Sequence, residues 1–134
     1  MKTKNVNKWL HVNYLKKANE FYDTAKNEFE RKNWNSCVLN AIHCAICAAD
    51  ALTIAFKGIR HAGERHEDVV KLFQELDMDT KVLKDKTKQL LALLDVKNST
   101  EYEEKLTTEN GASIALENAE RFFEWVGEQL KSES

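Results

Sequence analysis

Apolar residues recur at every third or fourth position through most of this chain, which is the spacing of amphipathic helices. The first stripe runs from Tyr14 to Lys32 and the second from Trp34 to Lys57. Later stripes predict a short helix after His66, a fourth helix marked from Val82 and reaching about Val96, and a last helix from about Ala112 to Leu130. The pattern therefore predicts five helices, four of them long.

Local signals refine these helices. Asn33 is expected to close the first helix in a left-handed turn, and the stretch from Asp77 to Thr80 offers a cap for the fourth. Leu91 is among the apolar residues that mark the fourth helix, and Ile114 is expected inward in the last one. The polar stretch 97–110 is predicted to be a connector, and no segment alternates at period two, so strands are not expected. We predict an all-α, up-and-down antiparallel four-helix bundle with one extra short helix.

Composition bounds the size and setting of this fold. The 134 residues, of which 43% are hydrophobic, suit one domain over 1–134, with 1–12 expected as a mobile N-terminal arm. No apolar run approaches the ~20 residues that span a bilayer. Cys37, Cys44 and Cys47 are odd in number and share one helical stretch, so they cannot form a disulfide framework. We expect a soluble protein of the reducing cytoplasm, without a membrane partner.

Charge is distributed unevenly although the net charge is only -2. Residues 1 to 32 carry eight Lys or Arg and four acidic residues, whereas residues 99 to 134 carry three Lys or Arg and nine acidic residues. Such asymmetry is expected when helices pair through complementary faces. The net charge is too small to indicate nucleic-acid binding by bulk attraction.

A basic segment follows the second helix. Between Gly58 and His66 it holds two arginines and two histidines, and its glycines permit unusual backbone angles. An anion such as phosphate could bind there, at the start of the next helix. The ligand-binding candidates are Arg60, His61, Arg65 and His66. In the structural alternative the arginines are solvated and His66 caps the third helix.

Four segments together resemble the HEPN domain family of small helical bundles. They are the first helix with its turn 31–34, the second helix around 41–52, the basic loop 58–68, and the stretch 95–102 before the last helix. The resemblance extends from about Tyr14 to Leu130. It implies a helical bundle that forms a homodimer and associates with RNA, with nucleotides, or with a nucleotidyltransferase or antitoxin partner.

Active members carry an Arg, a polar residue and, after a short gap, a His before the last helix. Here these positions resemble Lys97, Asn98 and Tyr102. Lys cannot reproduce the two-pronged contact of Arg with a phosphate, and a Tyr with a pKa near 10 is a poor proton carrier at neutral pH. The resemblance therefore implies a non-catalytic or weakly active binding or regulatory module. The alternatives are a metal-independent ribonuclease that uses these three residues, assisted by Arg60 and His66, and a purely structural interaction protein.

Two further features of the sequence concern metal binding and self-association. His43, Cys47 and Asp50 share a face of the second helix, but three candidate ligands on one helix rarely suffice for a metal, so we expect neither metal nor cofactor. Spare apolar surface would favour two-fold pairing of two copies. The residues expected to supply it are Trp9, Leu15, Ile59, Leu93 and Leu116.

Overall fold

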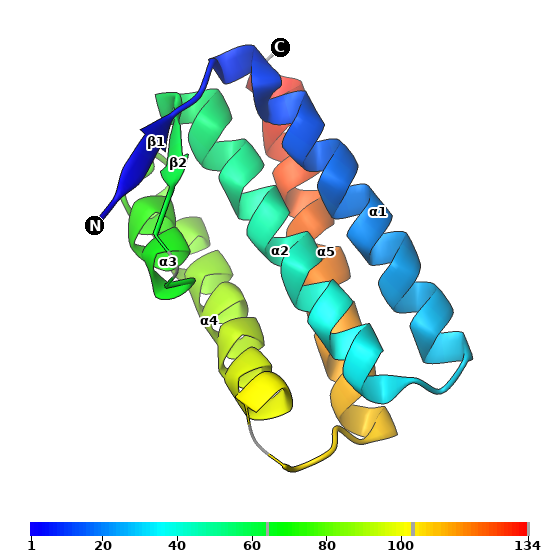
Figure 1. The fold of residues 1–134 in the computed structure, drawn as a ribbon. Helices are drawn as coiled ribbons and strands as arrows, with labels where there is room; N and C mark the ends of the chain where they lie inside the picture. Colours follow the sequence, from blue (N-terminus) through cyan, green and yellow to red (C-terminus); the bar gives the residue numbers. More distant parts are fainter. Residues whose placement is uncertain (64, 103, 134) are drawn as a thin grey trace.

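The described residues form a helical bundle with a small β-ribbon at its side (Figure 1). The computed structural model describes the backbone of residues 1–63, 65–102 and 104–133, and the side chains of 1–63, 65–96 and 104–131. The elements in chain order are β1 (Thr3–Asn5), the 3-10 helix η1 (Lys8–Leu10), α1 (His11–Glu30), α2 (Trp34–Lys57), β2 (Ile59–His61), α3 (Glu67–Gln74), α4 (Thr80–Tyr102) and α5 (Glu109–Glu133). The predicted all-α fold class is confirmed.

The central element is α2, which contacts every other α-helix of the bundle. Fourteen of its residues are buried, from Cys37 to Ile54. Within the described part of the chain it is long and apolar enough to cross a membrane, contrary to the expectation that no segment is. However, 78% of its apolar window is buried by the rest of the bundle, so its apolar character is that of a core helix.

Small side chains bring α1 and α2 together. Ala18 and Ala25 on α1 are fully buried, as are Ala41, Ala45 and Ala48 on α2. The two helices are joined by three residues, of which Lys32, not Asn33 as predicted, adopts the left-handed conformation with a φ of 64°. The Asn33 side chain instead donates a hydrogen bond to Glu28 (2.8 Å) and makes no capping hydrogen bond.

The two short strands were not expected from the sequence. β1 pairs with β2 in antiparallel register, with Thr3 opposite His61, Lys4 opposite Arg60 and Asn5 opposite Ile59. Backbone hydrogen bonds from Val6 to Gly58 (2.8 Å) and from Ala62 to Lys2 (2.9 Å) extend the ribbon at both ends. Three-residue strands are too short to show a period-two pattern, which is why the prediction missed them.

The later helices differ from prediction in length and rotation. α4 continues to Tyr102, beyond the predicted end near Val96, and α5 begins at Glu109. Leu93 is 1% exposed rather than part of the spare apolar surface, and Ile114, expected inward, is 52% exposed. A cap within the stretch from Asp77 to Thr80 is confirmed, and it is Asp79, whose Oδ1 accepts hydrogen bonds from the backbone N–H groups of residues 81 and 82.

Among the described side chains, no ion pair joins the basic α1 to the acidic α5. Most of the described ion pairs join residues three or four positions apart in the sequence. The exceptions are Lys57 with Glu75 (3.7 Å), which joins the end of α2 to the end of α3, and His61 with Asp50. The basic residues of α1 therefore keep much of their charge available at the surface.

Candidate functional site

The predicted basic loop begins with a sharp turn out of α2. Gly58 has a φ of +67°, and its N–H donates to the carbonyl of Ile54 (2.8 Å), which ends the helix. The next three residues form β2, so this part of the loop is held by β1 instead of projecting into solvent. The ribbon fixes the direction of each side chain that follows.

His61 lies inside the protein and binds Asp50 of α2. Its Nδ1 is 3.1 Å from the carboxylate Oδ1, and the two residues are 7% and 6% exposed. Buried polar groups of this kind need each other, because an unpaired one would lose its hydrogen bonds to water. The contact fastens β2 to the middle of α2.

His66 and His43 continue this polar cluster towards α1. The His66 ring centroid lies 6.2 Å from that of His61 and 6.2 Å from that of His43. The His43 ring in turn lies 5.4 Å from Phe21. His66 directly precedes α3 but makes no side-chain capping hydrogen bond, contrary to its expected role as a cap in the structural alternative. Among the described residues, no group of three or more His, Cys, Asp or Glu is placed to hold a metal ion.

Arg60 is half-buried and held in a defined position. Its Nη1 donates to the carbonyl of His61 (2.7 Å), and its Cζ lies 5.9 Å from the centroid of the Tyr14 ring. Its Nε is buried and has no hydrogen-bond partner among the described residues. Arg65 is exposed, whereas His66 is half-buried. Of the four predicted ligand-binding residues, the structure therefore fixes Arg60 and His61 and leaves Arg65 at the surface.

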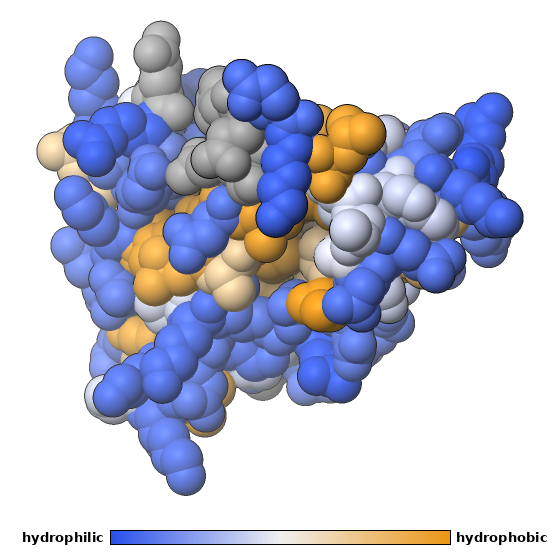
Figure 2. All heavy atoms as spheres, turned by 90° about the horizontal axis from the view of Figure 1, so that it is seen from below, coloured by the Kyte–Doolittle hydropathy of each residue, from blue (hydrophilic) through white to orange (hydrophobic). Residues whose placement is uncertain are grey.

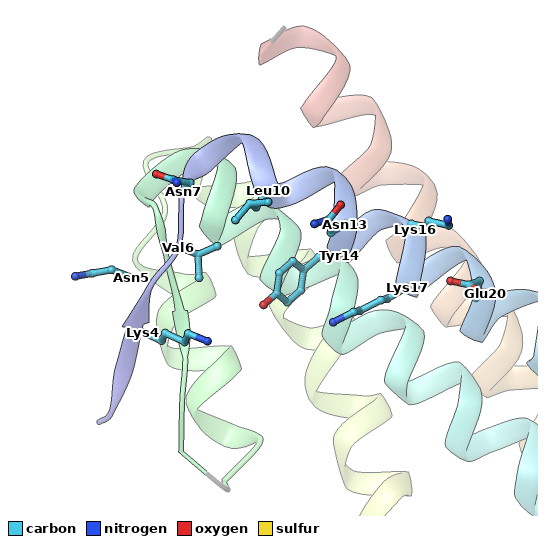
Figure 3. Close-up of a pocket in the computed structure, with 10 residues that line it drawn as sticks. All are labelled: Lys4, Asn5, Val6, Asn7, Leu10, Asn13, Tyr14, Lys16, Lys17 and Glu20. Atoms are coloured by element: carbon cyan, nitrogen blue, oxygen red, sulfur yellow. The ribbon is translucent and has the colours of Figure 1, made fainter.

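A hollow of about 690 Å³ lies between β1 and the first turns of α1. Arg60 is not one of its lining residues, but it contacts the ring of Tyr14, which is. Its lining residues are Lys4, Asn5, Val6, Asn7, Leu10, Asn13, Tyr14, Lys16, Lys17 and Glu20. Figure 3 shows the amino groups of Lys4 and Lys17 directed to the space beside the Tyr14 hydroxyl. The Nζ of Lys17 lies 5.0 Å from the Tyr14 ring centroid. Sequence reasoning missed this grouping, because it assigned Tyr14 to the apolar face of α1 and the N-terminal lysines to an arm.

The three cysteines are unsuited to nucleophilic chemistry at neutral pH. Burial, with a smaller contribution from the neighbouring Cys47, raises the pKa of Cys44 to about 12. Burial likewise raises the pKa of Cys37 and of Cys47 to about 11 each. Their thiols therefore stay protonated and pack as small apolar groups.

The predicted catalytic residues lie on the last turns of α4, at the lower end of the bundle in Figure 1. The side chains of Lys97, Asn98 and Tyr102 lie outside the described residues. Figure 2 views the molecule from below and shows hydrophobic side chains gathered in the middle of this face. A hollow of about 350 Å³ lies nearby, lined by residues that include Val96 and the 73% exposed Leu106.

Comparison with known proteins agrees with the fold. The model of a protein family described as the HEPN domain matches residues 12–130. No curated protein matches the chain. The matched residues include α1, α2, β2, α3 and α4 and most of α5, while β1 and η1 precede them.

Proposed function

Because this chain belongs to the HEPN domain family, we propose that it is a module that binds a nucleotide or RNA without cleaving RNA. Arg60 carries the proposal. It is a permanently charged group that the ribbon and Tyr14 hold in place, with a buried Nε–H that has no acceptor among the described residues. A guanidinium fixed in this way matches the oxygen geometry of phosphate.

Binding without cleavage is favoured by the residues at the family's catalytic positions. Lys97 is a weaker phosphate clamp than Arg, and Tyr102 exchanges protons poorly near neutral pH. Acidic residues surround Tyr102 in the sequence and oppose the approach of a phosphate backbone. The ribonuclease alternative requires Lys97, Asn98 and Tyr102 to supply general acid–base chemistry. Arg60 and His66 would assist them.

The proposal is tested by measuring binding and cleavage in the same samples. Labelled single-stranded RNA and a fluorescent nucleotide are titrated with the protein in a chelator, and the RNA is then examined on a denaturing gel. We expect saturable binding to at least one of the two, intact RNA, and a loss of affinity of about tenfold or more in Arg60→Gln. Arg31→Gln is the control, because Arg31 is exposed and its described ion pair is with the nearby Glu28 at the end of α1.

Two outcomes would contradict the proposal. RNA cleavage in the chelator that disappears in Tyr102→Phe would establish the ribonuclease alternative. Failure of the wild-type protein to bind either ligand would favour a structural interaction protein. Circular dichroism of each variant separates loss of binding from loss of folding.

Partner proteins belong to the same proposal. We propose that two copies of the chain form a homodimer. We also propose that this homodimer binds a nucleotidyltransferase or an antitoxin. Trp9 on η1 and Val12 on α1 support this, because they are 68% and 50% exposed and lie close together in the sequence. A cytoplasmic location remains the prediction that the cysteines suggest.

A further inference from the structure

The hollow between β1 and α1 gathers positive charge that the fold does not neutralise. Lys4 and Arg60 are directly paired across the ribbon, so their side chains share one face of it. Like charges at directly opposed positions destabilise a strand pair. Among the described ion pairs none involves Lys4 or Arg60. An anion between them would convert this repulsion into attraction.

A third cation completes the group from the side of α1. Lys17 and Arg60 both approach the Tyr14 ring, at 5.0 and 5.9 Å from its centroid. Lys4 reaches towards the same ring from β1 (Figure 3). Glu20 is the one acidic residue among those that line the hollow. Three cations from three elements, β1, β2 and α1, therefore converge around one tyrosine, which is a geometry for several anionic oxygens at once.

The remaining walls suit a small molecule with an apolar part. Val6, Leu10 and Tyr14 are half-buried and form an apolar side, while Asn13 offers amide groups at the rim. The volume of about 690 Å³ lies within the range of roughly 300–1,000 Å³ that is usual for small-molecule sites. A single-phosphate group would leave part of the positive charge unpaired.

We propose that this hollow binds a small molecule that carries two or more linked phosphate groups, such as a nucleoside di- or triphosphate. Lys4, Lys17 and Arg60 hold the phosphate oxygens, and the rest of the ligand lies against Val6 and Leu10. This inference rests on the proposed function and deepens it, because it specifies the binding site and chooses a free polyphosphate ligand over an RNA chain.

The test uses the full chain and a matched pair of double variants. Lys4→Ala/Lys17→Ala removes two cations from the hollow. Lys26→Ala/Lys84→Ala removes the same charge elsewhere, and Lys26 is a close match because its Nζ also lies over a tyrosine of α1, at 5.2 Å from the Tyr22 ring. All four lysines are exposed, so neither variant should disturb folding. The probes are ATP, ADP, AMP and adenosine, the corresponding guanosine series, inorganic tripolyphosphate and a short single-stranded RNA.

Isothermal titration should show affinity that falls from the triphosphate to the nucleoside. Loss of the hollow's two lysines should weaken triphosphate binding by about tenfold or more, and the control pair should change it by less than about twofold. Lys17→Glu provides a second variant, in which the loss should be larger. Unchanged triphosphate affinity in Lys4→Ala/Lys17→Ala and in Lys17→Glu would overturn the inference.

Other outcomes separate this inference from the proposed function. If Arg60→Gln weakens binding but the hollow's lysine variants do not, the protein binds the ligand elsewhere and only the inference fails. If the wild-type protein binds RNA but no mononucleotide or tripolyphosphate, the occupant is an RNA chain and again only the inference fails. If it binds none of the probes, both are wrong.

Discussion

Cys37, Cys44 and Cys47 lie on α2, and their surroundings set how they ionise. In each case burial disfavours the thiolate and raises the pKa above the ordinary value of 9.0. The helix therefore uses sulfur as a small apolar group that fits between closely packed neighbours. Sequence alone placed the three cysteines on one helical stretch, but it could not rank their thiols by burial, because burial depends on the helices packed against α2.

These pKa shifts predict that the protein loses stability at alkaline pH. A raised pKa in the folded state means that the unfolded chain releases its thiol protons first, so the free energy of unfolding falls as pH rises from about 9 towards 12. Below pH 9 both states are protonated and the effect vanishes. At about pH 10, Cys44 alone should reduce the free energy of unfolding by about 1.4 kcal/mol.

Urea unfolding at neutral and alkaline pH measures this effect. Cys44→Ala is expected to be less stable at neutral pH because of the cavity, but its further loss between the two pH values should be smaller than that of the wild type. An equal alkaline loss in the two proteins would show that Cys44 does not contribute.

At the scale of elements, α4 shows where local sequence signals succeed. Asp79 accepts hydrogen bonds from the N–H groups of Lys81 (3.0 Å) and Val82 (3.2 Å), as expected of a cap. The far end was missed because polar residues can continue a helix without an apolar stripe to reveal it. The rotation was also misjudged, since Leu93 is buried while Leu91 is 40% exposed. Because leucines occupy neighbouring positions, two rotations of α4 about its axis fit the apolar pattern equally well. Packing against the neighbouring helices selects one of them.

Removal of this cap should destabilise the bundle measurably. Asp79→Ala should lower the free energy of unfolding by about 1 kcal/mol, because two N–H groups at the start of α4 lose their acceptor. Asp79→Asn should retain most of the stability, since Asn is an equally good cap. Asp77→Ala is the control, and urea denaturation that gave equal losses for Asp77→Ala and Asp79→Ala would show that the cap has no special role.

The candidate site was only partly accessible to sequence reasoning. Arg60 was identified because basic residues cluster between Gly58 and His66. Its neighbours Lys4, Tyr14 and Lys17 were not, since pairing of β1 with β2 brings them together and three-residue strands leave no pattern. Tyr14 was assigned correctly to the inner side of α1, but the two cations above its ring depend on tertiary structure.

At the scale of the whole molecule, the exposed apolar residues indicate what the bundle leaves uncovered. Trp9 is 68% exposed and precedes α1, whereas Leu93, expected beside it in the same surface, is in the core. The four long helices thus cover most of their own apolar surface, and the most exposed large apolar side chains among the described residues are Leu106 at the lower end and Trp9 on η1.

The proposed pairing of two copies predicts a dimer in solution. Sedimentation velocity at micromolar concentration should give a mass about twice that of one chain, because spare apolar surface on small bundles is covered by two-fold association. Trp9→Glu should shift the mass towards that of one chain. A monomeric wild-type protein would contradict the pairing, while a dimer that persists in Trp9→Glu would place the interface elsewhere.

The β1–β2 ribbon also sets an order of events during synthesis. β1 leaves the ribosome before α1 and α2, but its partner strand follows the whole of α2. The α1–α2 hairpin needs only contacts close in sequence, so it can form before Thr3–Asn5 has a partner strand. Closing the long loop between the strands comes later. A nascent chain therefore acquires its α1–α2 hairpin first. The hollow between β1 and α1 is held in place by the ribbon only on chains whose translation has passed His61.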